Sequence, residues 1–251
     1  MCSSDLARLF FRRKKTVRSK LWKFLINQEK VKDVLFCHFP YEILQNSAIN
    51  RRIRLVLRFI LPRRTFFMQK LKLEELNRLS VAAFKTAAKT PIAVVLDDVR
   101  SALNVGSVFR TADAFACTEV ILCGFTATPP HREIMKTALG STESVAWRHF
   151  SETENALNAL RTEGYVLVAV EQAEGSIFLH DIDNQLFVKH DDNIKVALIL
   201  GNEVDGVSET AMEMADYVVE VPQFGTKHSL NIAVTAGIVV WEFCKELGIR
   251  N

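Results

Sequence analysis

The 251-residue sequence has few cysteines and no long apolar run. Its five cysteines are scattered, without a CxxC or a paired Cys/His spacing. This argues against a disulfide framework or a zinc site and predicts a reducing, cytoplasmic location. No apolar stretch reaches the ~18 residues of a membrane span, and Arg8 interrupts the apolar residues 6–11. We therefore expect neither a membrane helix nor a secretory signal.

Common nucleotide-binding and metal-binding patterns are also missing. No Lys-Ser or Lys-Thr follows the glycine-rich segment 201–206 (GNEVDG), and its spacing is not GxGxxG. No glycine fingerprint follows the first predicted strand, which disfavours a nicotinamide-dependent oxidoreductase. The histidines and the two Asp pairs show no ligand spacing, so we expect no metal site.

Charge is distributed very unevenly along the chain, although the net charge is only +3. Residues 1–70 carry 17 Lys and Arg against 4 Asp and Glu, a net charge of +13. The remaining 15 basic and 25 acidic residues leave residues 71–251 with a net charge of −10. This contrast indicates a basic N-terminal extension followed by a separate globular domain.

Three interpretations of the extension, residues 1–67, compete. Its Lys and Arg clusters would bind RNA phosphates without sequence preference, because such contacts release condensed counterions. An Arg-rich segment poor in acidic residues is also typical of an organellar targeting peptide. Alternatively, it is disordered or upstream of a true start at Met68, because no regular apolar period persists across it.

Residues 68–90 are expected to form one amphipathic helix before a globular domain at residues 91–251. Leu71, Leu76, Leu79 and Phe84 recur near helical spacing, with polar residues between them. Pro91 marks the end of this helix, because a proline pushes the preceding residue out of the α region.

Strand and helix patterns alternate through the globular domain. Apolar runs predict strands at residues 92–96, 119–123, 165–170 and 196–200, and a fifth strand that ends at Pro222. Helices are predicted at residues 104–116, 131–139, 152–163 and 229–247, with Asn104 and Ser229 as N-caps. The last helix is apolar nearly all round, so we expect it to be buried, with Gly237 close to a strand. This alternation predicts an α/β fold with a mostly parallel sheet flanked by helices.

The first motif with chemical potential follows the first strand and reads N-x-G-x-x-x-R-T-A, from Asn104. Gly106 and Arg110 share one helix face. Glycine is unfavourable near a helix start unless something approaches the backbone closely. Arg110 lies among apolar neighbours, which is an unusual place for a charge unless it is directed at an anion. A capped helix with a snorkelling arginine accounts for the same pattern.

Two further motifs follow late strands. Gly201-Asn202-Glu203 comes directly after one strand, and Ser229-Leu230-Asn231 opens the last helix, at the positive end of its dipole. Because ligands bind at the carboxyl ends of parallel strands, we expect both loops to hold one small molecule. Taken singly, a tight turn and ordinary helix capping account for these motifs.

Together and in this order, the three motifs resemble those of the SpoU (TrmH) family of RNA 2′-O-ribose methyltransferases, of the SPOUT class. The match covers residues 92–247. The resemblance implies a deep C-terminal trefoil knot, S-adenosylmethionine bent into that knot, tRNA or rRNA as substrate, and a homodimer with the active site near the subunit interface. One departure is Val204, where many members have a glycine after Asn-Glu.

The resemblance also implies roles for individual residues. The expected catalytic set is Asn104, Arg110, Glu203, Ser229 and Asn231. Val221 and Leu230 are expected to flank the adenine and ribose of the cofactor. The whole expected cofactor-binding set is Glu171, Leu200, Gly201, Asn202, Glu203, Gly206, Val221, Pro222, Ser229, Leu230 and Asn231.

Arg110 is an unsuitable general base, because a guanidinium does not lose its proton readily inside a protein. We expect it to bind the RNA phosphate next to the target ribose and to stabilise developing alkoxide charge. The base is then that phosphate, water or another group. RNA binding needs a local basic patch (Arg100, Arg110, Arg132 and Lys136) or the basic extension. The alternative function is a non-catalytic RNA-binding or assembly protein on the same fold.

Overall fold

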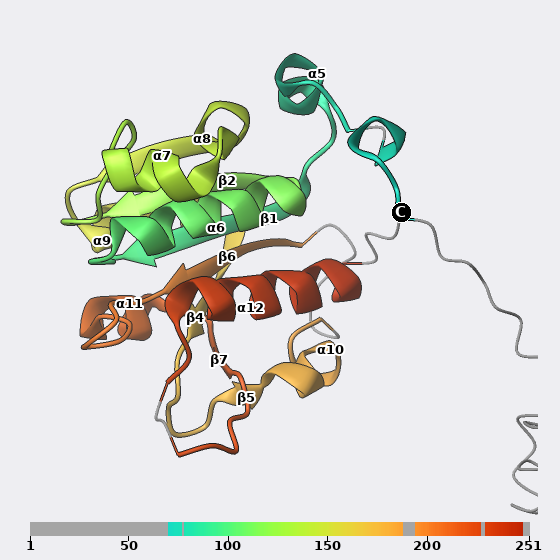
Figure 1. Ribbon diagram of the computed structural model, residues 1–251. Helices are drawn as coiled ribbons and strands as arrows, with labels where there is room; N and C mark the ends of the chain where they lie inside the picture. Colours follow the sequence, from blue (N-terminus) through green and yellow to red (C-terminus); the bar gives the residue numbers. More distant parts are fainter. Residues whose placement is uncertain (1–69, 77, 188–193, 227–228, 248–251) are drawn as a thin grey trace, which may run out of the picture. The chain divides into compact units, whose positions relative to one another are not determined.

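A computed structural model describes residues 70–76, 78–187, 194–226 and 229–247 (Figure 1). The chain divides into two compact units, Met1–Leu71 and Lys72–Asn251, and the second unit holds nearly all described residues. The interpretations of residues 1–67 and of a start at Met68 therefore lie outside the described residues. In the part of the chain that is described, no helix combines the length and apolar character needed to span a bilayer.

One parallel sheet forms the centre of the second unit. Its seven strands follow the spatial order β3-β2-β1-β6-β4-β7-β5, and each neighbouring pair runs parallel. The predicted α/β fold with a mostly parallel sheet is confirmed. The strands are β1 (Thr90–Asp97), β2 (Cys117–Cys123), β3 (Ala146–Phe150), β4 (Tyr165–Val170), β5 (Ile177–Phe178), β6 (Lys195–Leu200) and β7 (Tyr217–Glu220).

Helices cover both faces of this sheet (Figure 1). One face carries α6 (Ala102–Ala114), α7 (Arg132–Ala138), α8 (Ser141–Ser144) and α12 (Ile232–Glu246), and the other carries α9 (Thr153–Thr162) and α11 (Glu209–Met214). Side chains of β1 alternate between the two cores. Ile92, Val94 and Leu96 pack towards α6 and α12, whereas Ala93 and Val95 pack towards α9 and α11. Burial on both faces explains why this strand is a continuous apolar run.

The single helix predicted over residues 68–90 is wrong. The segment instead contains a 3₁₀ turn, η2 (Leu73–Leu76), and a short helix, α5 (Val81–Thr86). The Ser80 hydroxyl accepts a hydrogen bond from the Ala83 N–H, so a new helix begins there. Leu71 and Leu79 are 63% and 59% exposed, so their helical spacing does not reflect burial.

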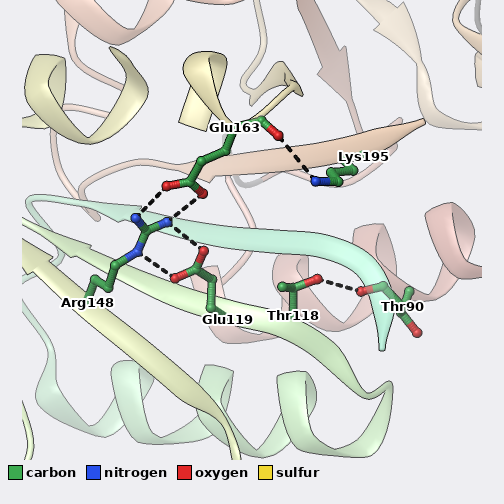
Figure 2. A network of polar contacts seen from close by, with 6 residues as sticks. All are labelled: Thr90, Thr118, Glu119, Arg148, Glu163 and Lys195. Carbon is green, nitrogen blue, oxygen red and sulfur yellow. Dashed lines mark hydrogen bonds and ion pairs between the residues drawn. The ribbon is translucent and has the colours of Figure 1, made fainter. Parts of the chain in front are cut away.

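The edge strand β3 was not predicted, because its side chains are mostly exposed and lack an apolar alternation. Polar contacts fix it instead, as Figure 2 shows. The Arg148 guanidinium donates to both oxygens of Glu119 on β2, at 2.6 and 2.7 Å, and to both oxygens of Glu163 at the end of α9, at 2.7 and 3.0 Å. Arg148 thus joins the edge strand to its neighbour and to a helix.

The last helix is exposed along one side, contrary to the prediction that it is buried all round. Val234, Ile238 and Trp241 recur one and two turns apart and are between 38% and 58% exposed. Among the described residues, no heavy atom lies within 4 Å of the position that a Cβ would take on Gly237, so it does not lie against a strand. The opposite side of α12 packs into the core through Ala236, Val240 and Phe243.

Candidate active site

The carboxyl ends of β4, β6 and β7 open into one cavity of about 490 Å³, within the ~300–1,000 Å³ range of small-molecule sites. The loop after β6 and the segment that leads into α12 form opposite parts of its wall. All of the expected cofactor-binding residues except Pro222 line it: Glu171, Leu200, Gly201, Asn202, Glu203, Gly206, Val221, Ser229, Leu230 and Asn231. Pro222 lines a neighbouring cavity instead.

A compact turn shapes one wall of the cavity. The backbone of Asn202 exchanges two hydrogen bonds with that of Gly206, at 2.8 and 3.0 Å. A Cβ on Gly201 would lie 2.1 Å from the carbonyl carbon of Gly206, so only glycine permits this approach. Val204, at the tip, is 68% exposed, so the larger side chain at this position lies mainly in solvent.

Two carboxylates, from the strands on either side of β6, accept hydrogen bonds from the residues that leave this turn. Glu171, directly after β4, accepts a hydrogen bond from the Val207 N–H at 3.0 Å. Asp97, the buried last residue of β1, accepts one from the Ser208 N–H at 2.9 Å and another from the Thr153 hydroxyl. The sequence interpretation ended the first strand at residue 96, counted Asp97 only in an Asp pair without ligand spacing, and missed this role. Its position after a buried strand was the only available signal.

Glu203 joins the turn to the start of α6. Its carboxylate accepts hydrogen bonds from the backbone N–H groups of Arg100 and Ser101, at 2.9 and 3.0 Å. The side-chain amide of Asn104 donates a third, at 2.9 Å. A carboxylate at the amino end of a helix is favoured by unpaired N–H groups and by the helix dipole. Glu203 therefore fixes the geometry between two segments about 100 residues apart.

These contacts also determine the charge of Glu203. Partial burial raises the pKa of its carboxyl group, but the hydrogen bonds from Arg100, Asn104 and Ser101 more than compensate, so its pKa lies below the ordinary value of 4.5. All of these donors are neutral groups. Glu203 consequently keeps a full negative charge beside the cavity at neutral pH.

Asn231, in the third motif, completes this set of hydrogen bonds. The Asn231 amide donates to the Asn104 side-chain oxygen at 3.2 Å, while its own oxygen accepts from the Ala233 N–H at the start of α12. The structure corrects both predicted caps: Ser101 rather than Asn104 caps α6, and Asn231 rather than Ser229 caps α12. One hydrogen-bonded series, Glu203–Asn104–Asn231, links all three motifs.

Arg110 and Gly106 lie on α6 away from the cavity lining. Arg110 is exposed, and within the described residues it makes no hydrogen bond or ion pair. A Cβ on Gly106 would lie 2.4 Å from the Ile134 carbonyl oxygen, so the expected close approach exists, but it comes from α7. Ser229 lines the cavity and is exposed. The single chain thus brings four of the five expected catalytic residues together and leaves Arg110 apart.

The described residues include no group of three or more His, Cys, Asp or Glu placed to hold a metal ion. Asn104 contacts the cavity only through its hydrogen bonds with Glu203 and Asn231. The remaining polar groups of the lining include Gln223 and Thr235, which the sequence interpretation did not select. The site is therefore built mainly from carboxamide, carboxylate and backbone groups.

Known proteins resemble this chain over the same region. An uncharacterized tRNA/rRNA methyltransferase from Borreliella burgdorferi is 28% identical over 191 residues, which cover 73% of this chain and 80% of the relative. The 23S rRNA (guanosine-2′-O-)-methyltransferase RlmB from Neisseria meningitidis is 27% identical over 165 residues, or 65% of this chain and 62% of the relative. For the second protein, the match thus spans less than two thirds of its length.

A solved structure shares the arrangement of the sheet and helices. The AdoMet-bound rRNA methyltransferase from Sinorhizobium meliloti aligns with a TM-score of 0.56 and 30% sequence identity, over 64% of this chain and 58% of that protein. Residues 91–241 match the family described as the SpoU rRNA Methylase family, and these residues contain all three motifs. The resemblance predicted from the motifs is thereby confirmed: the chain belongs to the SpoU rRNA methylase family.

Proposed function

We propose that this protein transfers a methyl group from S-adenosylmethionine to a ribose 2′-hydroxyl of a structured tRNA or rRNA. The hydrogen-bonded series Glu203–Asn104–Asn231 carries this proposal, because it joins the three family motifs at the edge of one cavity. The AdoMet-bound relative and the relative that acts on a guanosine 2′-hydroxyl support the same activity.

The cavity suits the cofactor in size and chemistry. Val221, Leu230 and Ile232 provide apolar surface for an adenine ring, and the backbone around Gly201 provides polar groups for its edge. Glu203 places a negative charge near the mouth, which favours a positively charged sulfonium. When bound, S-adenosylmethionine supplies an electrophilic methyl group on that sulfonium.

Glu203 acts in this proposal as a positioning group. Its carboxylate already accepts three hydrogen bonds and its pKa lies below the ordinary value, so it is a poor proton acceptor at neutral pH. By holding the amino end of α6 against the turn, it keeps Asn104 and Asn231 in place. Precise positioning of reactants can itself contribute several kcal/mol, ~7–11 in well-oriented systems.

Arg110 acts from the partner subunit in a homodimer. Its exposure and its distance from the cavity lining in one chain support this assignment. The exposed stripe Val234, Ile238 and Trp241 on α12 supplies an apolar surface for such a dimer. In the assembled site Arg110 binds the phosphate beside the target ribose and stabilises alkoxide charge, while water or that phosphate accepts the proton.

The C-terminal knot is part of this proposal. After β4 the chain forms β5 at the edge of the sheet, comes back to β6 on one side of β4, and then forms β7 on the other side of β4, between β4 and β5. The last helix, α12, then packs in the same core as α6, β1 and β6. This path of the chain, together with the hydrogen bond between Asn231 and Asn104, supports a knot in which the chain threads a loop beside the cofactor cavity.

Calorimetric titration with S-adenosylmethionine tests the cofactor, and mapping of 2′-O-methyl groups in RNA from cells with and without the gene tests the reaction. We expect binding by the purified full chain and the loss of at least one methylated ribose in the deletion. A chain that binds RNA but not the cofactor would instead be the non-catalytic RNA-binding protein of the alternative interpretation.

A further inference from the structure

A second cavity, of about 440 Å³, lies beside the candidate active site. The two cavities share Gln172, Glu220, Val221 and Gln223, so the carboxyl end of β7 separates them. The rest of the second cavity is lined by Phe178, His180, Pro222 and Phe224. Three of these four side chains are aromatic, and they come from two separate segments of the chain.

Two of the rings stack on one another. The centroids of the Phe178 and His180 rings are 5.6 Å apart and their planes differ by only 7°, which is an offset parallel pair. Phe178 ends β5 and His180 lies in the 3₁₀ turn η3 (Leu179–Asp181), so the edge of the sheet positions both. Phe178 is 46% exposed, so this stacked pair is accessible to a further ring.

The third ring comes from a different segment of the chain. Phe224, in the loop between β7 and α12, is 97% exposed in the single chain. A ligand that covers this ring would remove its apolar surface from water, which is favourable. The cavity therefore has aromatic rings from two segments of the chain and hydrogen-bonding groups on Glu220 and Gln223.

We propose that this second cavity binds an unpaired nucleobase of the substrate RNA, stacked on Phe178 and His180 and covered by Phe224. This inference rests on the proposed RNA methylation. Proteins recognise single-stranded RNA by stacking splayed-out bases on aromatic rings and by bonding to their edges. Because the two cavities share a wall, the base belongs to a nucleotide close to the methylated ribose.

The negative charge in and beside the second cavity restricts the orientation of the bound nucleotide. Glu220 repels phosphate but accepts hydrogen bonds from exocyclic amino groups, such as that of cytosine. Asp181, 3.5 Å from the His180 ring nitrogen, adds further negative charge. The base edge therefore points towards Glu220, and the sugar-phosphate backbone runs along the outer rim.

Substitutions of the rings test this inference in the full chain. Phe178→Ala and Phe224→Ala each remove one stacking surface, and Phe224→Tyr retains it. Phe125→Ala is a matched control, because Phe125 is also an exposed phenylalanine (62%) but follows β2, several strands away. We expect each alanine variant to raise the KM for bulk cellular RNA roughly 5- to 100-fold. Phe224→Tyr and Phe125→Ala should behave like the wild type.

Three further measurements separate the outcomes. Unchanged calorimetric affinity for S-adenosylmethionine shows that an alanine variant is folded and that its defect concerns RNA. Anisotropy with fluorescein-labelled oligo-U, oligo-C and oligo-A measures base binding independently of methylation, and absence of wild-type binding overturns the inference. A normal KM in both alanine variants of an active enzyme overturns it while the proposed function stands. A changed molar mass of Phe224→Ala assigns this ring to a subunit contact instead.

Discussion

The carboxylates at the two ends of the sheet are held by different kinds of donor. At the carboxyl end, Glu203 accepts hydrogen bonds from two backbone N–H groups and one side-chain amide. At the amino end, Glu119 and Glu163 share the guanidinium of Arg148 (Figure 2). Neutral donors fix a geometry and leave the charge of the carboxylate unchanged, whereas the Arg148 guanidinium neutralises one of the two negative charges that share it. The first arrangement therefore suits a binding site and the second a scaffold.

The largest effect is expected for Glu203→Gln. The amide would place an N–H group where a backbone N–H now donates, and the negative charge beside the cavity would be lost. We expect turnover to fall roughly 10²- to 10³-fold, with weaker binding of S-adenosylmethionine. Initial-rate kinetics and calorimetry measure both effects. Glu163→Gln makes the same chemical change at the other end of the sheet and should leave turnover intact; equal losses in both variants would refute the distinction.

Arg110→Lys is expected to rank second. The variant keeps the positive charge but loses the two-pronged guanidinium that matches a phosphate. Turnover should fall by about 10²-fold, whereas cofactor affinity should stay the same because Arg110 does not line the cavity. Near-normal turnover would contradict the proposed role of Arg110 in binding phosphate. Mixing Arg110→Lys with Glu203→Gln tests the dimer, since a mixed dimer contains one wild-type site and should recover activity.

Arg148→Met tests the scaffold end of the comparison. The substitution leaves the mostly buried Glu119 carboxylate, which is 8% exposed, without its guanidinium partner. We expect the free energy of unfolding to fall by about 1–3 kcal/mol, as measured by urea denaturation. Turnover per folded molecule should not change at a temperature where the variant is folded. A large catalytic defect with normal stability would contradict the assignment.

Lowering the pH should reduce the free energy of unfolding through the carboxylates at both ends of the sheet. This effect is expected to be the smallest of the four. The hydrogen bond from Arg148 lowers the pKa of Glu163, and the pKa of Glu203 is lowered as well. A carboxylate with a depressed folded-state pKa stabilises the protein above its unfolded pKa, about 4.3. That stabilisation is lost as the pH falls through the folded-state value. Urea denaturation between pH 7 and pH 3 should show this fall, and Glu163→Gln should reduce its slope.

Continuous apolar runs predicted the central strands well. The predicted strand at residues 165–170 coincides with β4, and those at residues 92–96 and 196–200 lie within β1 and β6. Such strands are buried on both faces, so nearly all of their residues are apolar and the sequence shows them directly. The edge strand β3 and the break at Ser80 were missed, because a salt-bridge network and a local cap decided them.

The first residues of α6 and α12 were predicted less well than the residues that line the cavity. Asn104 and Ser229 are good capping residues, yet Ser101 and Asn231 cap the two helices. Several polar residues near each start can form a cap, and the tertiary contact selects one of them. Asn104 is instead used by Glu203 and Asn231, from segments far away in the sequence.

The sequence by itself determined the parallel α/β sheet, the family, and ten of the residues that line the cavity, because apolar runs and motif residues are properties of residue type. Only the tertiary structure revealed that the carboxylates of Asp97 and Glu203 accept hydrogen bonds from backbone N–H groups of distant segments. Nearly every residue has a backbone N–H group, so the sequence does not show which of these groups are used. It also decided that one side of α12 is exposed and that Phe178, His180 and Phe224 meet around a second cavity. These features depend on which surfaces the folded chain brings together, and the order of residues does not display them.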